Sequence, residues 1–288
     1  MKVAILTDSN SGITQKQGEE AGIYVIPMPF MMGDETYYED ISLTRKEFYE
    51  KLKGGIDIST SPPSPADIMD FCNRLLEEYD DVVHIPMSSG LSSSCHTAMM
   101  LAEDSEGKVF VENNQRISVT LRQSVLEAKK MADAGMSGQD IRKKLEDTKM
   151  DSSIYITLDT LEYLKKGGRI TPAAALLGSF LRIKPVLTIQ GEKLDAFAKA
   201  RTMKQAKTMM IMAAKKDMEE RFKDPEGVHT CIAVAHSENE AASLEFKQEL
   251  EELFPKTGEI YVDHLSLSVS CHIGPGALAI ACTKRLDL

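Results

Sequence analysis

Tryptophan is absent from this 288-residue sequence, and aromatic residues of all kinds make up 6% of it. Positive charge is also scarce, because 34 Lys and Arg residues stand against 44 Asp and Glu residues and give a formal net charge of −10. A protein that binds nucleic acid through its phosphates needs a basic surface. The charge balance therefore argues against a nucleic-acid partner.

Cysteine is sparse and scattered. The five Cys residues include no CxxC pair, which is typical of reduced thiols in a cytoplasmic protein and not of a disulfide scaffold. The sequence has no run of 18 apolar residues, and its first residues hold too short an apolar stretch for a signal peptide. These absences predict a soluble, cytoplasmic protein.

The common enzyme motifs are missing as well. There is no GxGxxG, Walker A, HExxH or GxSxG sequence, and no two of the six His residues have the i, i+4 spacing of a helical metal site. The sequence therefore predicts no nucleotide cofactor and no metal.

Alternating apolar and amphipathic segments are present instead. Short apolar runs of the buried-strand type occur at Lys2–Leu6, Tyr24–Phe30, Val82–Pro86 and Lys108–Val111. Amphipathic helical stretches follow them at Arg45–Leu52, Ala66–Tyr79, Ser94–Glu103 and Val119–Ala134. This order predicts an α/β fold whose N-terminal domain has a mostly parallel sheet flanked by helices.

The second half of the chain has a different pattern. Ser153–Thr157 is expected to be a strand, and Pro185–Ile189 with Lys193–Ala200 a hairpin. We expect a domain boundary near residues 148–153, which gives an N-terminal α/β domain over 1–152 and a C-terminal α/β domain over 153–288. The alternative that the last strand returns to the first domain stays open.

Two hydroxyl-rich turns stand out. The first is Ser59–Pro65, in which Ser64, Pro65 and Asp67 suit the start of a helix with a capping box. The second is Ser88–Ser94, between an expected strand and an expected helix. Capping a helix needs one hydroxyl and each turn has several, so both turns are candidate anion sites at helix N-termini.

Two further segments combine glycine with polar residues. Lys165–Ile170 contains Gly167 and Gly168 followed by Arg169, which by itself fits a helix end and a solvated turn. Cys271–Gly276 is expected to be a tight turn that precedes an apolar strand.

Together these segments resemble the DegV family, whose members are similar to the fatty acid-binding subunits of bacterial fatty acid kinase. The resemblance runs nearly end to end. It rests on Leu6–Ser9, Tyr38–Asp40, Thr60–Ser64, Ser88–Ser92, Leu161–Ile170, Ile183–Leu187, Arg201, His272 and Gly274–Gly276. It departs from the family at Pro63, at Ser93 and Ser94, and at Glu112–Asn114.

The resemblance implies two α/β domains with a long-chain fatty acid, such as palmitate, held between them. It assigns the carboxylate to Thr60 and Ser92, with Ser61 and Ser93 as the alternatives one residue along. It also places Arg169, Arg201 and His272 at the head-group opening or at the surface that meets a partner.

That partner would be a separate fatty acid kinase, because this chain has no nucleotide motif. The implied role is a non-catalytic carrier that presents the carboxylate for acyl phosphate formation and so feeds phospholipid synthesis, with transient contact to a membrane surface left open. The alternative is a serine-dependent acyl hydrolase or transferase with Ser92 as nucleophile and His272 as base, although no acidic third member is evident.

Overall fold

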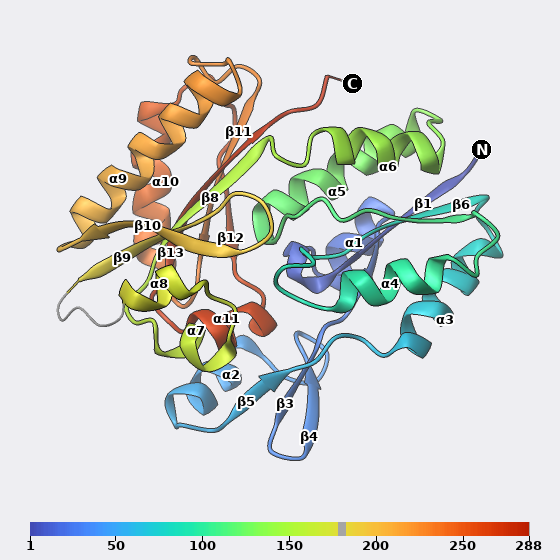
Figure 1. Cartoon of the computed structure of the whole chain (residues 1–288), viewed down its shortest axis with the longest axis horizontal. Coiled ribbons are helices and arrows are strands. Elements are labelled where there is room, and N and C mark those ends of the chain that lie inside the picture. The colour runs from blue at the N-terminus through green and yellow to red at the C-terminus, as the bar shows by residue number, and fades with distance from the viewer. Residues whose placement is uncertain (178–182, 288) are drawn as a thin grey trace. The chain divides into compact units, whose positions relative to one another are not determined.

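The computed structural model describes residues 1–177 and 183–287. The chain divides into two compact units, whose elements are shown in Figure 1. Unit 1 contains residues 1–150 together with Ser266–Ser268, and unit 2 contains residues 151–265 and 269–287.

Unit 1 is built on a four-stranded parallel sheet. In spatial order its strands are β2 (Tyr24–Ile26), β1 (Val3–Asp8), β6 (Asp81–Ile85) and β7 (Val109–Val111). Every residue of β1 is buried, as expected of a strand that is covered on both faces.

Helices cover both faces of this sheet. They are α1 (Gln15–Ala21), α3 (Pro65–Leu76), α4 (Ser94–Ala102), α5 (Ser118–Asp133) and α6 (Gly138–Asp147), with the 3-10 turn η1 (Ser9–Ser11) after β1. Helix α2 (Arg45–Lys53) lies outside this sheet and packs through Phe48 on Phe30, with the two ring centres 5.7 Å apart. Figure 1 shows α3 and α4 on one side of the sheet and α5 and α6 on the other. The predicted parallel α/β architecture of this part is confirmed.

A second sheet in unit 1 was not predicted. It is antiparallel, with the order β4 (Glu35–Tyr38), β3 (Pro29–Met32) and β5 (Ile58–Thr60). The sequence predicted one strand over Tyr24–Phe30, but Pro27 lies in its middle. Proline has no N–H for a ladder, so the run is divided between two sheets.

Unit 2 contains a six-stranded mixed sheet. Its spatial order is β10 (Leu194–Ala200), β9 (Lys184–Ile189), β8 (Ser152–Thr157), β13 (Leu278–Lys284), β11 (Thr230–His236) and β12 (Tyr261–His264). Strands β9 and β10 form the predicted antiparallel hairpin. The prediction left open a return of the last strand to the first domain. That option is wrong, because β13 pairs with β8 and β11.

The helices of unit 2 are α7 (Glu162–Gly167), α8 (Pro172–Leu177), α9 (Met203–Lys216), α10 (Glu240–Leu253) and α11 (Leu267–Ile273), with a π-helical turn η2 (Asp217–Arg221) after α9. Met210 of α9 and Phe246 of α10 are fully buried in one apolar cluster that also includes Ile280 of β13. Helices α9 and α10 therefore cover the same face of the sheet.

Helix α11 corrects another prediction. Cys271 and His272 were expected in a tight turn, but they lie in the last turn of this helix, and the turn begins at Gly274. Helix α11 begins at Leu267 in the segment that belongs to unit 1, and from Val269 onward it belongs to unit 2.

Candidate functional site

The strand order of the parallel sheet marks a place for a ligand. The order β2-β1-β6-β7 means that the chain moves from β1 outward to β2 and then returns past β1 to β6. In open parallel sheets, ligands bind beside the carboxyl ends of the strands that flank such a reversal. The segments after β1 and β6 are therefore the first candidates.

The second hydroxyl turn, Ser88–Ser94, follows β6 at this edge. The carbonyl of Ser88 accepts the N–H groups of Leu91 at 3.0 Å and Ser92 at 3.2 Å. Asn113, which follows β7, accepts the N–H of Ser89 at 3.2 Å and donates to its hydroxyl at 2.7 Å. The turn is thus fixed by its own backbone and by the neighbouring loop.

Ser92 and Ser93 differ in what their side chains do. Ser92 is half-buried, and its hydroxyl oxygen accepts the N–H of Ser94 at 3.2 Å. That bond uses the oxygen as an acceptor and leaves the hydroxyl proton to be donated. Ser93 is exposed at the N-cap of α4 and makes no side-chain capping bond. The geometry therefore favours Ser92 over Ser93 as a donor to an anion.

The first hydroxyl turn follows β5. Ser64 forms the predicted capping box: it accepts the N–H of Asp67 at 3.1 Å and donates to its carboxylate at 2.7 Å. Thr60 is the last residue of β5 and is half-buried. The N–H of Ser61 donates to the carbonyl of Pro29 at 3.4 Å. The capping box of α3 uses only the hydroxyl of Ser64, so the hydroxyls of Thr60 and Ser61 take no part in it.

A buried polar network at the end of β1 was missed by the sequence analysis. Asp8 accepts the N–H groups of Met87 at 2.8 Å and Asn10 at 2.9 Å. Burial raises the pKa of Asp8 to about 6, although these hydrogen bonds act in the opposite direction. The amide oxygen of Asn10 accepts the hydroxyls of Ser266, at 2.8 Å, and Ser268. This network joins the ends of β1 and β6 and holds residues 266–268 within unit 1.

Glu39, whose side chain is 12% exposed, is a second carboxyl that holds the same segment. It accepts the N–H of Leu267, the first residue of α11, at 2.8 Å and pairs with Arg45 at 3.4 Å. Burial raises the pKa of Glu39 to about 7. Position is the only local signal for these two carboxyls, since each lies at or just after the end of a strand.

Arg169 and His272 lie close together in unit 2. Arg169 donates to the carbonyl of Gly167, and a Cβ atom at Gly167 would overlap the ring of His272. Burial lowers the pKa of His272 to about 4, with a smaller contribution from the positive charge of Arg169. Arg201 lies just after β10, is exposed, and donates its N–H to the side chain of Gln205 at 2.8 Å.

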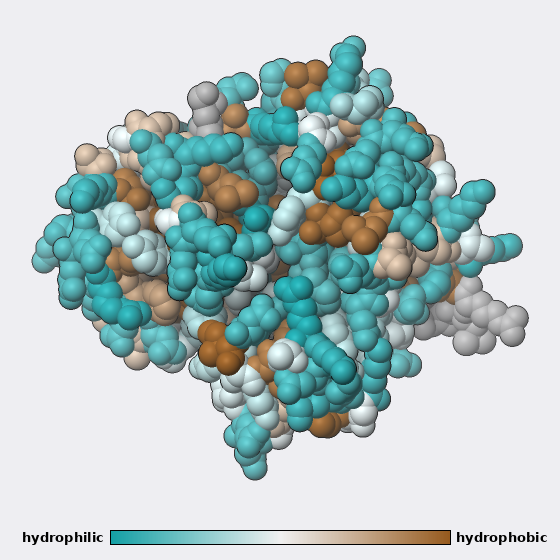
Figure 2. Space-filling model, turned by 180° about the vertical axis from the view of Figure 1, so that it is seen from behind, coloured by the Kyte–Doolittle hydropathy of each residue, from teal (hydrophilic) through white to brown (hydrophobic). Residues whose placement is uncertain are grey.

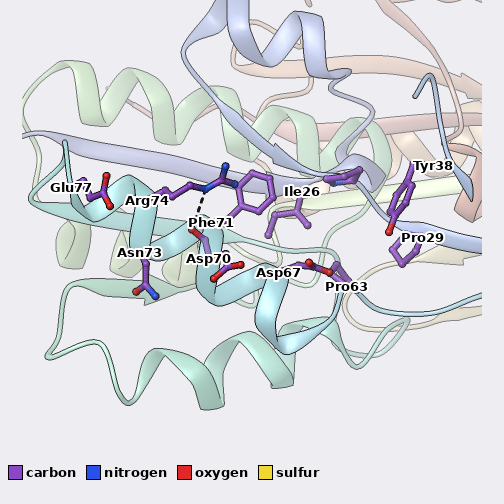
Figure 3. Close-up of a pocket in the computed structure, with 11 residues that line it drawn as sticks. Ile26, Pro29, Tyr38, Pro63, Asp67, Asp70, Phe71, Asn73, Arg74 and Glu77 are labelled. Atoms are coloured by element: carbon purple, nitrogen blue, oxygen red, sulfur yellow. Dashed lines mark hydrogen bonds between the residues drawn. The ribbon is translucent and has the colours of Figure 1, made fainter. Parts of the chain in front are cut away.

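A pocket of about 510 Å³ opens beside the first hydroxyl turn (Figure 3). It is lined by Ile26, Pro27, Pro29, Tyr38, Pro63, Asp67, Asp70, Phe71, Asn73, Arg74 and Glu77. The guanidinium of Arg74 lies 4.9 Å from the ring centre of Phe71, and its Nε donates to the carbonyl of Asp70 at 3.3 Å. Neither Thr60 nor Ser92 is among the lining residues, so this pocket is not the predicted carboxylate site.

The described residues contain neither a candidate metal site nor a candidate membrane-spanning helix. Over residues 1–177 and 183–287, no group of three or more His, Cys, Asp or Glu residues could hold a metal ion. Within the same ranges, no helix has both the length and the apolarity needed to cross a bilayer. Figure 2 shows one face of the molecule, on which hydrophilic side chains predominate and hydrophobic ones form small separate patches.

Comparison with protein families gives a match over residues 2–285 to the family described as "Uncharacterised protein, DegV family". "Protein DegV" of Bacillus subtilis is 30% identical over 285 residues, which cover 97% of this chain and 98% of that protein. A DegV domain-containing protein of Deinococcus radiodurans is also 30% identical, over 98% of both chains.

Solved structures give the same result. A chain described as "Fatty Acid Binding of a DegV family Protein from Thermus thermophilus" is 29% identical with a TM-score of 0.90, over 99% of this chain and 100% of that one. DegV from Bacillus subtilis, described as a fatty acid binding protein, is 29% identical with a TM-score of 0.87 over the same shares. The match of sequence and fold along almost its whole length makes this chain a member of the DegV family.

Proposed function

We propose that this chain binds a long-chain fatty acid and presents its carboxylate to a separate fatty acid kinase, which forms the acyl phosphate used in phospholipid synthesis. The observation that carries the proposal is the likeness, at 29% identity, to two DegV chains that are described as binding fatty acid. The hydroxyl turns that contain Thr60 and Ser92 support it, since both offer donors for a carboxylate.

The acyl tail would supply most of the affinity. Burying roughly 14 methylenes at about 0.8 kcal/mol each gives on the order of 11 kcal/mol before the costs of binding. A hydrogen bond from a hydroxyl contributes about 1 kcal/mol, and about twice that when the acceptor is a carboxylate. Thr60 and Ser92 would therefore orient the head group more than they hold the ligand.

The residues of unit 2 suit the step that follows binding. A guanidinium matches the geometry of a phosphate, so we assign Arg169 and Arg201 to the acyl phosphate or to the kinase surface. We assign His272 to the same step as a neutral hydrogen-bonding group, because its pKa of about 4 leaves it uncharged near neutral pH. The same low pKa makes His272 a weak base, which argues against the acyl hydrolase alternative.

The carboxylate assignment predicts a separation of binding from presentation. The double substitution Thr60→Ala with Ser92→Ala should leave most of the bound fatty acid in place and slow kinase-dependent acyl phosphate formation about tenfold or more, because the two donors orient the reacting group. Lipid extracted after denaturation and phosphorylation by a supplied kinase measure the two effects. Ser59→Ala, an exposed hydroxyl on the same strand, is the matched control. Complete loss of lipid from a folded double variant would contradict this division, and an acyl-serine adduct in the intact mass would favour the hydrolase.

The assignments in unit 2 give a different prediction. Arg169→Ala, Arg201→Ala and His272→Ala should each keep the bound fatty acid and the melting temperature while slowing acyl phosphate formation. Lys204→Ala, at an exposed residue of α9, is the control. Arg221→Ala would be a poor control, because Arg221 pairs with buried Asp217. Phosphorylation rates equal to wild type in all three variants would remove these residues from the site.

A further inference from the structure

The pocket of about 510 Å³ beside the first hydroxyl turn is not used by the proposed function. Sites for small organic ligands have volumes of about 300–1,000 Å³, so this pocket has the size of such a site. One wall runs along α3 from Asp67 to the C-cap Glu77, and the other includes Ile26, Pro29 and Tyr38 (Figure 3). All of these residues belong to unit 1. The pocket is therefore a groove within one unit, and it follows about 15 Å of helix, at 1.5 Å of rise per residue.

The floor of the groove is apolar and its rim is charged. Ile26, Pro29 and Pro63 are buried, and Phe71 is half-buried. The exposed lining residues all belong to α3 or to its C-cap, and they are Asp67, Asp70, Asn73, Arg74 and Glu77. Three carboxylates thus stand against one guanidinium. A complementary ligand places apolar groups on the floor and positive charge at the rim.

Two of the three carboxylates are available to a ligand, because the third, Asp67, belongs to the capping box of α3. Asp70 and Glu77 lie four residues before and three residues after Arg74, which are the spacings of helical ion pairs. The guanidinium instead lies over the ring of Phe71, and its Nε donates to the backbone carbonyl of Asp70. Within residues 1–177 and 183–287, neither Asp70 nor Glu77 has an ion-pair partner.

The lining is rich in hydrogen-bond acceptors. Pro27, Pro29 and Pro63 contribute no N–H group, and carboxylates only accept. An extended peptide brings a carbonyl with almost every N–H and would leave many of its acceptors unpaired. Ammonium groups only donate, so the lining favours an amine over a peptide. The negative rim disfavours an anion and also a second copy of this chain, whose net charge is −10.

We propose that this groove binds a linear aliphatic polyamine, a chain of methylenes that carries two or more ammonium groups. The methylenes lie on Phe71 and on the prolines of the floor, and the ammonium groups pair with Asp70 and Glu77. These two residues are about two helical turns apart, about 10.5 Å along the axis, which is a distance that extended spermidine spans. The lining includes neither Thr60 nor Ser92, so the inference does not depend on the proposed function.

Spermidine is the probe, and isothermal titration calorimetry at low salt measures its dissociation constant. Wild type should bind one equivalent, with a shift of the side-chain amide signals of Asn73 in NMR spectra. Asp70→Asn with Glu77→Gln should weaken binding about fivefold, because two exposed ion pairs are lost. Arg74→Gln should tighten binding about threefold, because it removes a competing cation.

A second double variant controls for the general attraction of a polycation to an acidic chain. Glu245→Gln with Glu252→Gln removes the same two charges, at the same seven-residue spacing, from exposed positions of α10. This variant should bind spermidine as wild type does. Equal weakening by both double variants, or displacement of spermidine by an equal concentration of Mg²⁺, would overturn the proposal, because charge alone would then explain the binding. Tetralysine that binds more tightly than spermidine would overturn it in favour of a basic peptide.

Discussion

Replacement of Gly274 by alanine is expected to lower the free energy of unfolding by about 3 kcal/mol. Gly274 has a φ of 79°, in the left-handed region that costs a residue with a Cβ about 1 kcal/mol. A Cβ atom there would also lie 2.6 Å from Cε2 of Tyr163 and closer still to Cδ2. The aromatic ring or the turn would have to shift, which adds about 1–3 kcal/mol.

Gly168 provides the matched control for this effect. Its φ is 66°, and no atom lies within 4 Å of a Cβ built on it. Gly168→Ala should therefore show the conformational cost alone, about 1 kcal/mol. Urea unfolding of both variants, followed by circular dichroism, measures the difference. If the two alanine variants are equally stable, the contact with Tyr163 is not what requires glycine at position 274.

Local signals were sufficient to predict much of the architecture. The capping residues Ser64 and Asp67 marked the start of α3, and the closely spaced runs Pro185–Ile189 and Lys193–Ala200 marked the hairpin of β9 and β10. These features depend on residues a few positions apart, so one sequence contains them fully. The same holds for the hydroxyl turn after β6, which is defined by its place between a strand and a helix.

Helix α11 could not be predicted because contacts distant in sequence hold it. Its residues include Val269 and Ile273, which are β-branched, and two serines that compete with the helix backbone. Its first N–H donates to Glu39, 228 positions away, and the hydroxyl of Ser268 donates to Asn10, 258 positions away. No local pattern carries such information, and the neighbouring glycines favoured a turn.

The candidate site shows the same limit. The two hydroxyl-rich turns stood out because each has more hydroxyls than a cap needs, and the resemblance to the DegV family then pointed to Thr60 and Ser92 within them. Asp8 did not stand out, since its role depends on the N–H of Met87, 79 positions away. Burial of Asp8 and of His84 is a property of the folded sheet, and so are the pKa values that follow from it.

Buried ionisable groups in unit 1 act on stability in opposite directions as pH changes. Burial raises the pKa of Asp8 to about 6 and that of Glu39 to about 7, so the folded chain binds these protons more tightly than the unfolded chain does. Their stabilising contribution to the free energy of unfolding is therefore full in acid and is lost as pH rises through those values. The pKa of His84 is lowered to about 4, so the unfolded chain binds its proton more tightly. The contribution of His84 is full above about pH 6.5 and is lost as pH falls toward 4.

The substitution His84→Leu isolates this last contribution. A pKa of about 4 in the folded state against 6.5 in the unfolded state corresponds to about 3 kcal/mol. Neither ring nitrogen of His84 has a hydrogen-bond partner among the described residues, and leucine removes both nitrogens, so the variant should be at least as stable as wild type near pH 7. The free energy of unfolding of the variant, relative to that of wild type, should then rise by about 2–3 kcal/mol as pH falls from about 6.5 to about 4.5.

Urea unfolding of both proteins at a series of pH values measures that difference in the free energy of unfolding. The contributions of Asp8 and Glu39 to its pH dependence cancel, because both proteins contain these carboxyls. Asp8→Asn serves as a control of opposite sign, since removing its carboxyl should help most at neutral pH and least in acid. Parallel stability curves for wild type and His84→Leu across this range would mean that the imidazole is protonated equally easily in both states. In that case His84 would be reached by water in the folded chain, and neither its burial nor its low pKa would describe the molecule in solution.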